Sequence, residues 1–300
     1  MTPSTTSTGS ISFADQVAPY SPWNAPPTSL TKQLLQNLIK NSKFNNIMIY
    51  YIEPNVVSYA QELGITVLGI IGLTMNTDDN KKSIESAISV SRQYPNTMLG
   101  LICGNEMGND YGATSNVAYI INNCIATLRA ANIPQAIGVN DIFNTWYNQG
   151  AGWKVVSNNV DFVGLNDYAW YQNYFATLPM TCQTPANAAR TTLANHNMVQ
   201  AIYPDKPVIQ TEFGWPGAPA GSSIAAQPNI YSGQVCSSAN NANQATVVQG
   251  VIDLFRSANI PCNIFAAYRE SWKVIGTSAI EGQWGICQEA SPYTCINVPK

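Results

Sequence analysis

Two glutamates lie at points where apolar, strand-like stretches end. Glu212 belongs to KPVIQTEFGWPG (206–217), which begins as a strand and ends in glycine and proline residues typical of a turn. Glu106 belongs to MLGLICGNE (98–106), another apolar run, and directly follows Asn105. Paired carboxylates cleave glycosidic bonds: one protonates the leaving oxygen and the other acts on the opposite side of the sugar. The pair therefore predicts glycoside hydrolysis, whereas a single strand-end acid would fit helix capping equally well.

Most other catalytic machinery is excluded by what the chain lacks. The one histidine, His196, lies in a polar helical stretch and is expected on the surface of its helix. Unless it takes part, Ser-His-Asp triads, Cys-His pairs and histidine zinc sites are excluded. The cysteines have no CxxC spacing, and no glycine-rich nucleotide-binding pattern follows a strand. Lys206 precedes its strand, so only Lys273 is placed for a Schiff base, and we expect neither a cofactor nor a metal.

Side chains near these glutamates suit a sugar substrate. Asn105 is placed to hydrogen-bond a sugar hydroxyl beside the reacting carbon. Seven aromatic residues just beyond the sixth, seventh and eighth strands could stack on sugar rings: Tyr168, Trp170, Tyr171, Trp215, Tyr268, Trp272 and Trp284. Ordinary packing is the alternative use of each ring, and we expect about half of them to contact sugar.

The elements that position these residues alternate along the chain. Strand-like stretches occur at 15–20, 45–52, 65–72, 97–104, 135–140, 160–167, 206–212 and 262–268. Several are rich in Val and Ile without polar alternation, as in parallel strands that are covered on both faces. Apolar residues at helical spacing lie between them, for example in 117–128 and 247–255. The pattern predicts an α/β fold, a single (β/α)8 TIM barrel that forms one catalytic domain over residues 11–300.

The two ends of the chain are expected to depart from this pattern. Residues 1–10 have no apolar core, and we predict that they are a disordered remnant of a leader. Only about 30 residues follow the last strand, so the eighth helix must be short or irregular.

Composition bounds the partners and the compartment. Charged residues make up 10% of the chain, and the net charge is −3. The Lys and Arg residues form no basic stripe, and no apolar run approaches the roughly 18 residues of a membrane span. We therefore expect a monomer that binds neither nucleic acid nor membranes. The low charge and abundant small polar residues are typical of a secreted protein, which predicts an extracellular or cell-wall location.

Seven cysteines leave at least one without a disulfide partner. Cys287 and Cys295 are close in the sequence and are the best candidates for a disulfide, and a Cys182–Cys236 bridge is a second candidate. Cys103 ends a strand and Cys124 lies on an apolar helical stripe, so both are expected to be buried free thiols.

Four stretches of the chain resemble family 17 of the glycoside hydrolases. They are GNE (104–106), TEFGWP (211–216), FAAYRESWK (265–273) and EGQWG (281–285), with looser matches at YSP (20–22) and IMIY (47–50). The Glu-x-Gly-Trp-Pro stretch is the specific signal, and the match covers essentially the whole barrel. The resemblance implies a retaining β-1,3-glucanase or β-1,3-glucanosyltransferase of the fungal cell-wall branch, with β-1,3-glucan as its partner.

The same resemblance implies roles for individual residues. Glu106 is expected to be the acid/base and Glu212 the nucleophile that forms a covalent glycosyl intermediate, with Tyr168 hydrogen-bonded to Glu212. The expected substrate-binding residues are Tyr20, Tyr50, Asn105, Asn166, Tyr168, Trp170, Tyr171, Trp215, Tyr268, Glu270, Trp272, Lys273 and Glu281.

Two positions depart from the family pattern. Met48 stands where the pattern usually carries Arg, and Arg269 stands where it usually carries an acid. Both are expected near the mouth of the barrel, where Arg269 could resupply the positive charge that is missing at Met48. A non-catalytic glucan-binding barrel is therefore an alternative, and another endo-β-glycosidase of the same clan, such as a β-1,4-mannanase or galactanase, is a third.

Overall fold

The strands close into a barrel. The computed structural model of the 300-residue chain describes residues 10–17, 20, 24, 26–42, 44–174, 183–218, 230–231, 234–235, 237–273 and 280–297. Eight strands form one closed barrel in the order β1-β10-β7-β6-β5-β4-β3-β2, with helices between strands. This architecture is the (β/α)8 barrel that the alternating sequence predicts.

Strand and helix bounds follow the predicted alternation. The barrel strands are β1 (Ser10–Ser12), β2 (Asn46–Ile49), β3 (Thr66–Ile71), β4 (Met98–Asn105), β5 (Ala136–Ile142), β6 (Phe162–Asn166), β7 (Val208–Phe213) and β10 (Cys262–Ile264). A separate two-stranded sheet pairs β8 (Ile230–Tyr231) with β9 (Gln234–Val235). The helices are α1 (Thr28–Ser42), α2 (Pro54–Glu62), α3 (Thr77–Gln93), α4 (Met107–Tyr111), α5 (Ser115–Ala130), α6 (Phe143–Ser157), α7 (Pro185–Ile202) and α8 (Asn241–Ser257).

Three 3-10 turns complete the elements. They are η1 (Ala169–Tyr174), η2 (Ser271–Lys273) and η3 (Glu281–Gln283). Within the described residues after β10, η2 and η3 are the only helical elements, in agreement with the predicted short or irregular last helix.

The first strand lies earlier than predicted. The sequence favoured 15–20, but β1 spans Ser10–Ser12, so it begins at the last residue of the expected leader. Asp15 instead turns the chain toward α1: Val17 N donates to Asp15 O at 2.9 Å, and Thr31 Oγ1 of α1 donates to the buried Asp15 carboxylate at 2.5 Å. Residues 13–17 therefore lead from β1 toward α1 and belong to no strand, although the apolar residues among them resemble one.

Two compact units are distinguished within the chain and are described separately below. Unit 1 comprises Met1–Ser10, Asn45–Asp167 and Asn195–Thr211. Unit 2 comprises Ile11–Phe44, Tyr168–Ala194 and Glu212–Lys300. The expectation of one catalytic domain from residue 11 onward stays a prediction.

The core of unit 1 fills the inside of its strands. Residues from β2 to β7 form one buried cluster: Met48, Leu68, Ile70, Ile102, Ala136, Phe162 and Ile209. Six successive strands can share a cluster only if these side chains point inward. Gly138 leaves room for the Phe162 ring, because a Cβ at residue 138 would lie 2.2 Å from Phe162 Cε2. Met48 therefore packs in the barrel interior, and its expected position near the mouth was wrong.

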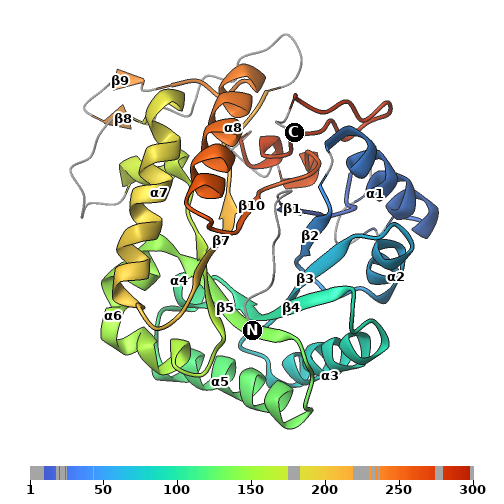
Figure 1. Ribbon diagram of the computed structural model, residues 1–300, viewed down its shortest axis with the longest axis vertical. Coiled ribbons are helices and arrows are strands. Elements are labelled where there is room, and N and C mark those ends of the chain that lie inside the picture. Colours follow the sequence, from blue (N-terminus) through green and yellow to red (C-terminus); the bar gives the residue numbers. More distant parts are fainter. Residues whose placement is uncertain are drawn as a thin grey trace. The chain divides into compact units, whose positions relative to one another are not determined.

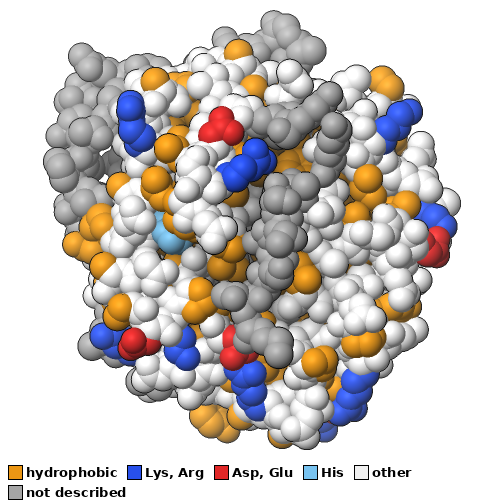
Figure 2. All heavy atoms as spheres, viewed as in Figure 1, with side chains coloured by type: hydrophobic (Ala, Val, Ile, Leu, Met, Phe, Trp, Pro, Cys, Tyr) orange, Lys and Arg blue, Asp and Glu red, His pale blue; other side chains and the backbone are white. Residues whose placement is uncertain are grey.

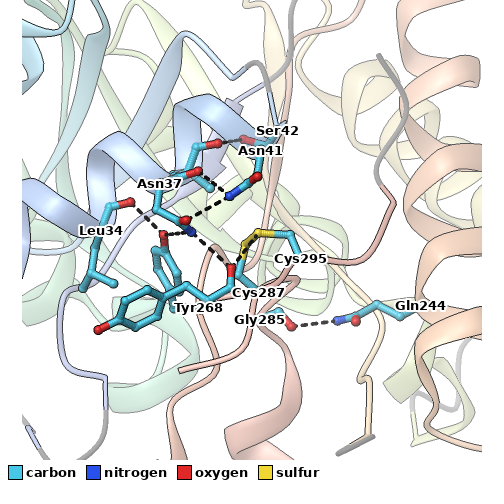
Figure 3. Close-up of a disulfide and its surroundings, with 11 residues drawn as sticks. Leu34, Asn37, Asn41, Ser42, Gln244, Tyr268, Gly285, Cys287 and Cys295 are labelled. Carbon is cyan, nitrogen blue, oxygen red and sulfur yellow. Dashed lines mark hydrogen bonds between the residues drawn. A yellow bond between two sulfur atoms is a disulfide. The ribbon is translucent and has the colours of Figure 1, made fainter. Parts of the chain in front are cut away.

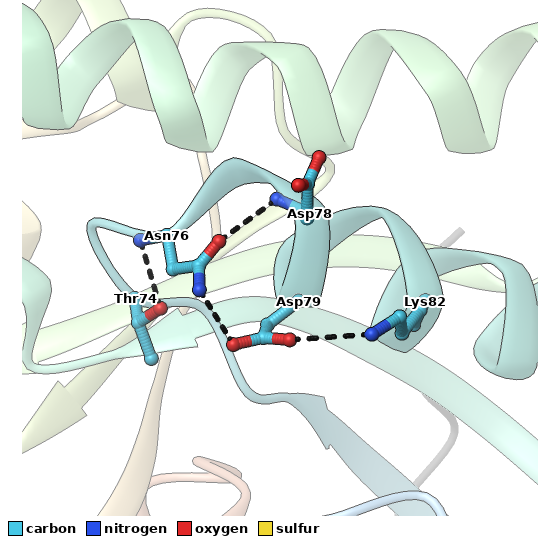
Figure 4. Close-up of polar contacts among 5 residues, drawn as sticks. All are labelled: Thr74, Asn76, Asp78, Asp79 and Lys82. Atoms are coloured by element: carbon cyan, nitrogen blue, oxygen red, sulfur yellow. Dashed lines mark hydrogen bonds and ion pairs between the residues drawn. The ribbon is translucent and has the colours of Figure 1, made fainter.

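Helices cover the outer faces of these strands. Figure 1 shows α2, α3 and α5 outside β2, β3 and β4. The start of α3 is capped by Asn76, whose side chain accepts a hydrogen bond from Asp78 N at 3.1 Å and donates to Asp79 at 2.8 Å (Figure 4). Lys82 forms an ion pair with Asp79 at 3.6 Å one turn further on. Such a cap satisfies backbone donors that have no partner inside the helix, and so fixes where α3 begins.

In unit 2, α1 is joined to the segment that follows β10. The Tyr268 hydroxyl donates to Leu34 O at 2.7 Å, and Asn37 Nδ2 donates to the same hydroxyl at 3.1 Å (Figure 3). The Tyr268 ring also packs edge-on against Phe13 and Tyr293. Tyr268 is thus a buried packing residue, and its expected stacking on sugar was wrong.

The disulfides differ in part from the expectation. Cys287 and Cys295 are bonded as predicted, at a sequence separation of 8 (Figure 3). Cys103 and Cys124 also form a disulfide, with a Cα–Cα distance of 6.1 Å, so the prediction of two free thiols was wrong. A strand end and a helix stripe 21 residues away face each other across one β-α layer, which sequence spacing does not reveal. Cys262 is free, and the Cys182–Cys236 candidate lies outside the described residues.

His196 is buried, contrary to its expected surface position. Its Nε2–H donates to Val208 O of β7 at 3.0 Å, and Asn195 beside it donates to the buried Asp167 at 3.1 Å. Burial lowers the pKa of His196 and outweighs its hydrogen bonds, which act in the opposite direction. Asn195 and His196 of this polar stretch therefore face the strands, and each has a hydrogen-bond partner in the protein.

The surface carries few charges. On the face shown in Figure 2, positive and negative side chains are scattered among uncharged ones, several as neighbours of opposite sign, and no large patch of one sign is seen there. Among the helices of the described residues, none combines the length and the apolar character that a membrane crossing requires.

Candidate active site

The end of β4 fixes Glu106. Glu106 adopts a left-handed backbone conformation (φ 51°, ψ 30°) between β4 and α4, and its N–H donates to Asn140 O at 3.2 Å. Asn166 Nδ2 donates to Glu106 Oε1 at 2.7 Å. A left-handed conformation is uncommon for a residue other than glycine and persists only where its surroundings impose it. The strand end thus holds this carboxylate in one place and one orientation.

A network of side-chain amides surrounds Glu106 within unit 1. Thr211 Oγ1 of β7 donates to Asn166 Oδ1 at 2.7 Å, which turns the Asn166 amide nitrogen toward Glu106. Asn105 Oδ1 accepts from Asn140 at 2.8 Å and from Asn166 at 3.3 Å. With its oxygen so occupied, Asn105 presents an NH2 group that has no protein partner within the described residues. Asn105 and Asn166 were predicted as site residues, whereas Asn140 and Thr211 were not.

A buried carboxylate supports the segment after Glu106. Asp141 of β5 accepts hydrogen bonds from Gly108 N of α4 at 2.7 Å and from Ile142 N at 2.8 Å. Burial raises its pKa to about 6, although hydrogen bonds from Thr145 and these backbone groups act to lower it. A Cβ at residue 108 would lie 2.7 Å from Asp141 Oδ2, so only glycine allows this approach. Sequence reasoning missed Asp141, whose one signal is an acid that follows a polar residue at a strand end.

Glu212 of unit 2 has aromatic surroundings. The Tyr168 hydroxyl donates to Glu212 Oε2, which is the contact that the family resemblance implies. The Tyr168 ring packs edge-on against Trp284 and Phe265, with centroids 4.9 and 5.9 Å away. Two further rings thus hold the phenol that orients Glu212.

Two more acids of unit 2 are paired. Lys273 Nζ donates to Glu270 Oε2 at 2.5 Å and lies 4.7 Å from the centroid of the Phe265 ring. Burial raises the pKa of Glu270, and the positive charge of Lys273 opposes this effect. The Tyr171 hydroxyl donates to Glu281 Oε1, and its ring lies against Trp284. These four residues were all predicted for the site, and the Phe265 ring beside Lys273 has its centroid 6.3 Å from that of the Trp284 ring beside Tyr171.

Other predicted residues serve packing. Trp170 and Trp215 are both buried and pack edge to face, with centroids 4.8 Å apart, so their expected role as sugar platforms was wrong. Arg269 is buried as well and donates to Asn241 at 2.7 Å and to Gln288 at 3.1 Å. These bonds tie α8 to the tail and hold the Arg269 guanidinium there, whereas Met48 lies in the apolar cluster of the other unit. The expectation that Arg269 resupplies a charge missing at Met48 was therefore wrong. Tyr20, Tyr50 and Trp272 remain partly exposed.

Residues 18–285 match the BtgE/BtgC glycoside hydrolase domain, which is most of the chain. The chain belongs to the BtgE/BtgC glycoside hydrolase family.

Two curated relatives illustrate the likeness within this glycoside hydrolase family. The chain is 20% identical to a probable β-glucosidase btgE of Aspergillus terreus over 94% of this chain and 46% of that protein. It is 21% identical to the namesake of Aspergillus fumigatus over 82% of this chain and 40% of that protein. The chain thus spans less than half the length of these relatives.

Solved structures share the fold. A glycoside hydrolase family 17 β-1,3-glucanosyltransferase from Rhizomucor miehei has a TM-score of 0.72 and 18% identity, over 96% of this chain and 97% of that chain. An endo-laminarinase from Formosa has a TM-score of 0.75 and 14% identity, over 94% of this chain and 83% of that chain. At these identities the likeness shows the barrel fold. Together with the family match, it makes the chain a glycoside hydrolase barrel.

Proposed function

We propose that this chain is a retaining, family 17 type enzyme that cleaves β-1,3-glucan. The observation that carries the proposal is that the two strand-end glutamates each have a dedicated hydrogen-bond donor, Asn166 for Glu106 and Tyr168 for Glu212. Both glutamates end strands of one closed barrel, and barrels of this kind hold their catalytic groups at the carboxyl ends of the strands. An Rhizomucor miehei β-1,3-glucanosyltransferase mutant with a TM-score of 0.73 to this chain was solved with laminaritriose, which supports a β-1,3-glucan substrate.

The proposed chemistry has two steps. Glu106 gives its proton to the glycosidic oxygen while Glu212 attacks the anomeric carbon, so that the leaving sugar departs as an alcohol and a glycosyl ester forms on Glu212. Glu106, now a carboxylate, takes a proton from water or from a sugar hydroxyl, which attacks the same carbon and releases Glu212. Asn105 donates its NH2 group to a hydroxyl of the sugar next to the cleaved bond.

The partition between hydrolysis and transfer depends on the acceptor. A bound sugar meets the covalent intermediate at high effective concentration, whereas water competes unbound. We expect glucanosyl transfer at millimolar oligosaccharide and hydrolysis when the substrate is dilute. Tyr171 is partly exposed and remains a candidate for the acceptor side, whereas the buried Trp170 no longer is.

The disulfides support an oxidising compartment, because such bonds persist mainly in secreted proteins. We therefore propose that the enzyme is extracellular or in a cell wall, where β-1,3-glucan is present.

A second candidate activity is removal of single glucose units, which is favoured by the likeness to the probable β-glucosidases of Aspergillus. One experiment separates the possibilities: digestion of laminarin, with chromatography of the products and proton NMR of the first-formed anomer. β-Configured oligosaccharides support retaining endo-action, and glucose alone supports the glucosidase. Products longer than an oligosaccharide substrate demonstrate transfer.

The control for this digestion is Glu212→Gln, which should bind laminarin yet form no product. If the wild-type chain binds laminarin and forms no product, it is a glucan-binding barrel. Cleavage of mannan or galactan in place of laminarin would overturn the substrate assignment.

A further inference from the structure

Exposed apolar side chains gather at one edge of unit 1. In the described part of the chain, four large apolar side chains are exposed: Tyr51 (65%), Met75 (42%), Tyr111 (45%) and Tyr119 (68%). Tyr51 follows β2, Met75 follows β3, and Tyr111 ends α4, which follows β4. Tyr119 alone lies elsewhere, on the covering helix α5. Three of the four thus follow three consecutive strands.

The strand pairing brings the segments that carry these three residues to one edge of the barrel. β2 pairs with β3 and β3 with β4, both in parallel, so their carboxyl ends lie at the same edge. Neighbouring strands are about 4.8 Å apart, and the segments that leave them are therefore neighbours. A Cβ at Gly104 would lie 3.6 Å from Leu73 Cδ1, which places the segment after β3 against the end of β4. Glu106 follows β4 at this same edge.

The Tyr51 ring lies on bare backbone. A Cβ at Gly72 would be 2.9 Å from Tyr51 Cε1 and 3.2 Å from Tyr51 Cδ1. The ring therefore rests against the chain directly after β3, and most of its surface is open to solvent. A ring that is already held in place loses little conformational freedom when a ligand covers its open face.

The backbones that carry the other two side chains are also fixed. Thr74 and Asn76 flank Met75, and Asn76 N donates to Thr74 Oγ1 at 3.0 Å (Figure 4). Thr74 N donates to Asn80 Oδ1 at 2.8 Å, which ties the segment to α3. Tyr111 ends α4, which Asp141 holds through Gly108 N. An apolar row on three fixed segments is a surface that is prepared for a ligand.

We propose that this row, Tyr51, Met75 and Tyr111, binds a stretch of the β-glucan chain beyond the sugars at the cleaved bond. The proposal rests on the proposed function, because the row continues from Glu106 through α4. Aromatic rings and the polarisable Met sulfur suit the apolar faces of sugar rings. Contact points on three successive segments suit a linear polymer better than a compact ligand. The row then determines how strongly chain length affects binding.

The experiment compares Tyr51→Ala with Tyr119→Ala, a loss of an equally exposed tyrosine away from the row. Affinity for laminarin and for β-1,3-gluco-oligosaccharides of three to six units is measured in the Glu212→Gln background. KM and kcat are measured in the active enzyme. We expect Tyr51→Ala to weaken binding of the longest chains about 3- to 10-fold, as one stacking contact contributes, with a smaller loss for the trisaccharide. Tyr119→Ala should bind every chain like the parent protein.

A second variant tests the position of the ring. Gly72 has no positive φ, so Gly72→Ala is compatible with the backbone, but its methyl group must displace the Tyr51 ring. Gly72→Ala should therefore show the same dependence on chain length as Tyr51→Ala. Melting temperatures of the variants exclude unfolding as the cause of the loss.

Three outcomes would overturn the proposal. They are equal binding by Tyr51→Ala and Tyr119→Ala, an equal loss for all chain lengths, and loss of self-association or protein binding with unchanged glucan affinity. Failure of the proposed function has a different signature: the wild-type chain forms no product from any β-glucan, while the binding measurements still decide whether the row holds one.

Discussion

The two glutamates of this barrel have opposite kinds of surroundings. Glu106 of unit 1 is bounded by side-chain amides, with Asn166 as its donor and Asn105 and Asn140 bonded beside it. Glu212 of unit 2 is bounded by a phenol and by the rings that hold that phenol. A phenol that donates to a carboxylate stabilises its charged form. The Asn166 amide also donates to its carboxylate, but its own oxygen accepts from Thr211, so the donor to Glu106 belongs to a polar network and the donor to Glu212 to an aromatic one. The proposed roles, Glu106 as the acid/base and Glu212 as the nucleophile, can be tested against this difference.

Among the tests of this comparison, replacement of Glu106 should have the largest effect. Glu106→Ala should lower kcat on laminarin by about 10²- to 10⁴-fold, the usual contribution of a general acid. With a dinitrophenyl β-glucan oligosaccharide as substrate, the rate of the first step should fall much less, because this leaving group needs no protonation. Stopped-flow release of dinitrophenol measures this step. If the activated substrate loses as much as laminarin, the two roles are wrongly assigned.

The disulfides of the two units close loops of different length. The Cys103–Cys124 bond of unit 1 joins β4 to α5 across 21 residues, and the Cys287–Cys295 bond of unit 2 spans 8. By loop-closure entropy, the Cys103–Cys124 bond contributes about 3 kcal/mol to the free energy of unfolding and the Cys287–Cys295 bond about 2.5 kcal/mol. Replacing Cys103 and Cys124 by serine should therefore lower the free energy of unfolding more than replacing Cys287 and Cys295 does. Urea denaturation of the two double variants measures this difference. A greater loss from the unit 2 pair would contradict this ranking.

Within unit 2, two tyrosines with the same neighbours provide a matched pair. Tyr168 donates to Glu212 and Tyr171 donates to Glu281, and both rings pack on Trp284. A hydrogen bond to a charged group contributes about 1.5–3 kcal/mol, so Tyr168→Phe should lower kcat at least about 10-fold. Tyr171→Phe should act mainly on KM, since Glu281 is proposed to bind substrate. The two variants need to be compared on one oligosaccharide. Equal effects on kcat would remove the special role of Tyr168.

The smallest expected effect concerns His196 of unit 1. Burial lowers its pKa in the folded protein, so its neutral form is favoured there and the unfolded chain takes up the proton more readily. The stability that this preference contributes is present above about pH 6.5 and is lost as the pH falls below it, by at most about 1.4 kcal/mol per pH unit. His196→Gln keeps a donor for Val208 O but cannot titrate. Its free energy of unfolding should thus fall less between pH 7 and pH 5 than that of the parent protein. An unchanged difference between the two pH values would show that His196 does not titrate in this range.

The sequence alone predicted the barrel and pointed to the two glutamates that we propose as catalytic. Apolar runs separated by amphipathic helices dictate the strand order, because parallel strands need a crossover of this length. Glu106 and Glu212 could be recognised because an acid at the end of a buried strand costs free energy of folding and is retained where it has a partner or a function. Paired acids of this kind are also a known device of sugar cleavage.

Tertiary structure decided which of the other residues surround the two glutamates and which are buried in packing. Nothing in the sequence singles out Asp141, Asn140 and Thr211. They support Glu106 and its neighbours through contacts between elements that are separated in the sequence. The same holds for the Cys103–Cys124 bond and for the burial of His196, which depend on which side of a helix faces the strands. Trp215 and Tyr268 show the reverse case, because a ring just beyond a strand end can point into the packing or into solvent. A one-dimensional pattern reports that a side chain is apolar. Only the packed structure decides whether protein or ligand covers it.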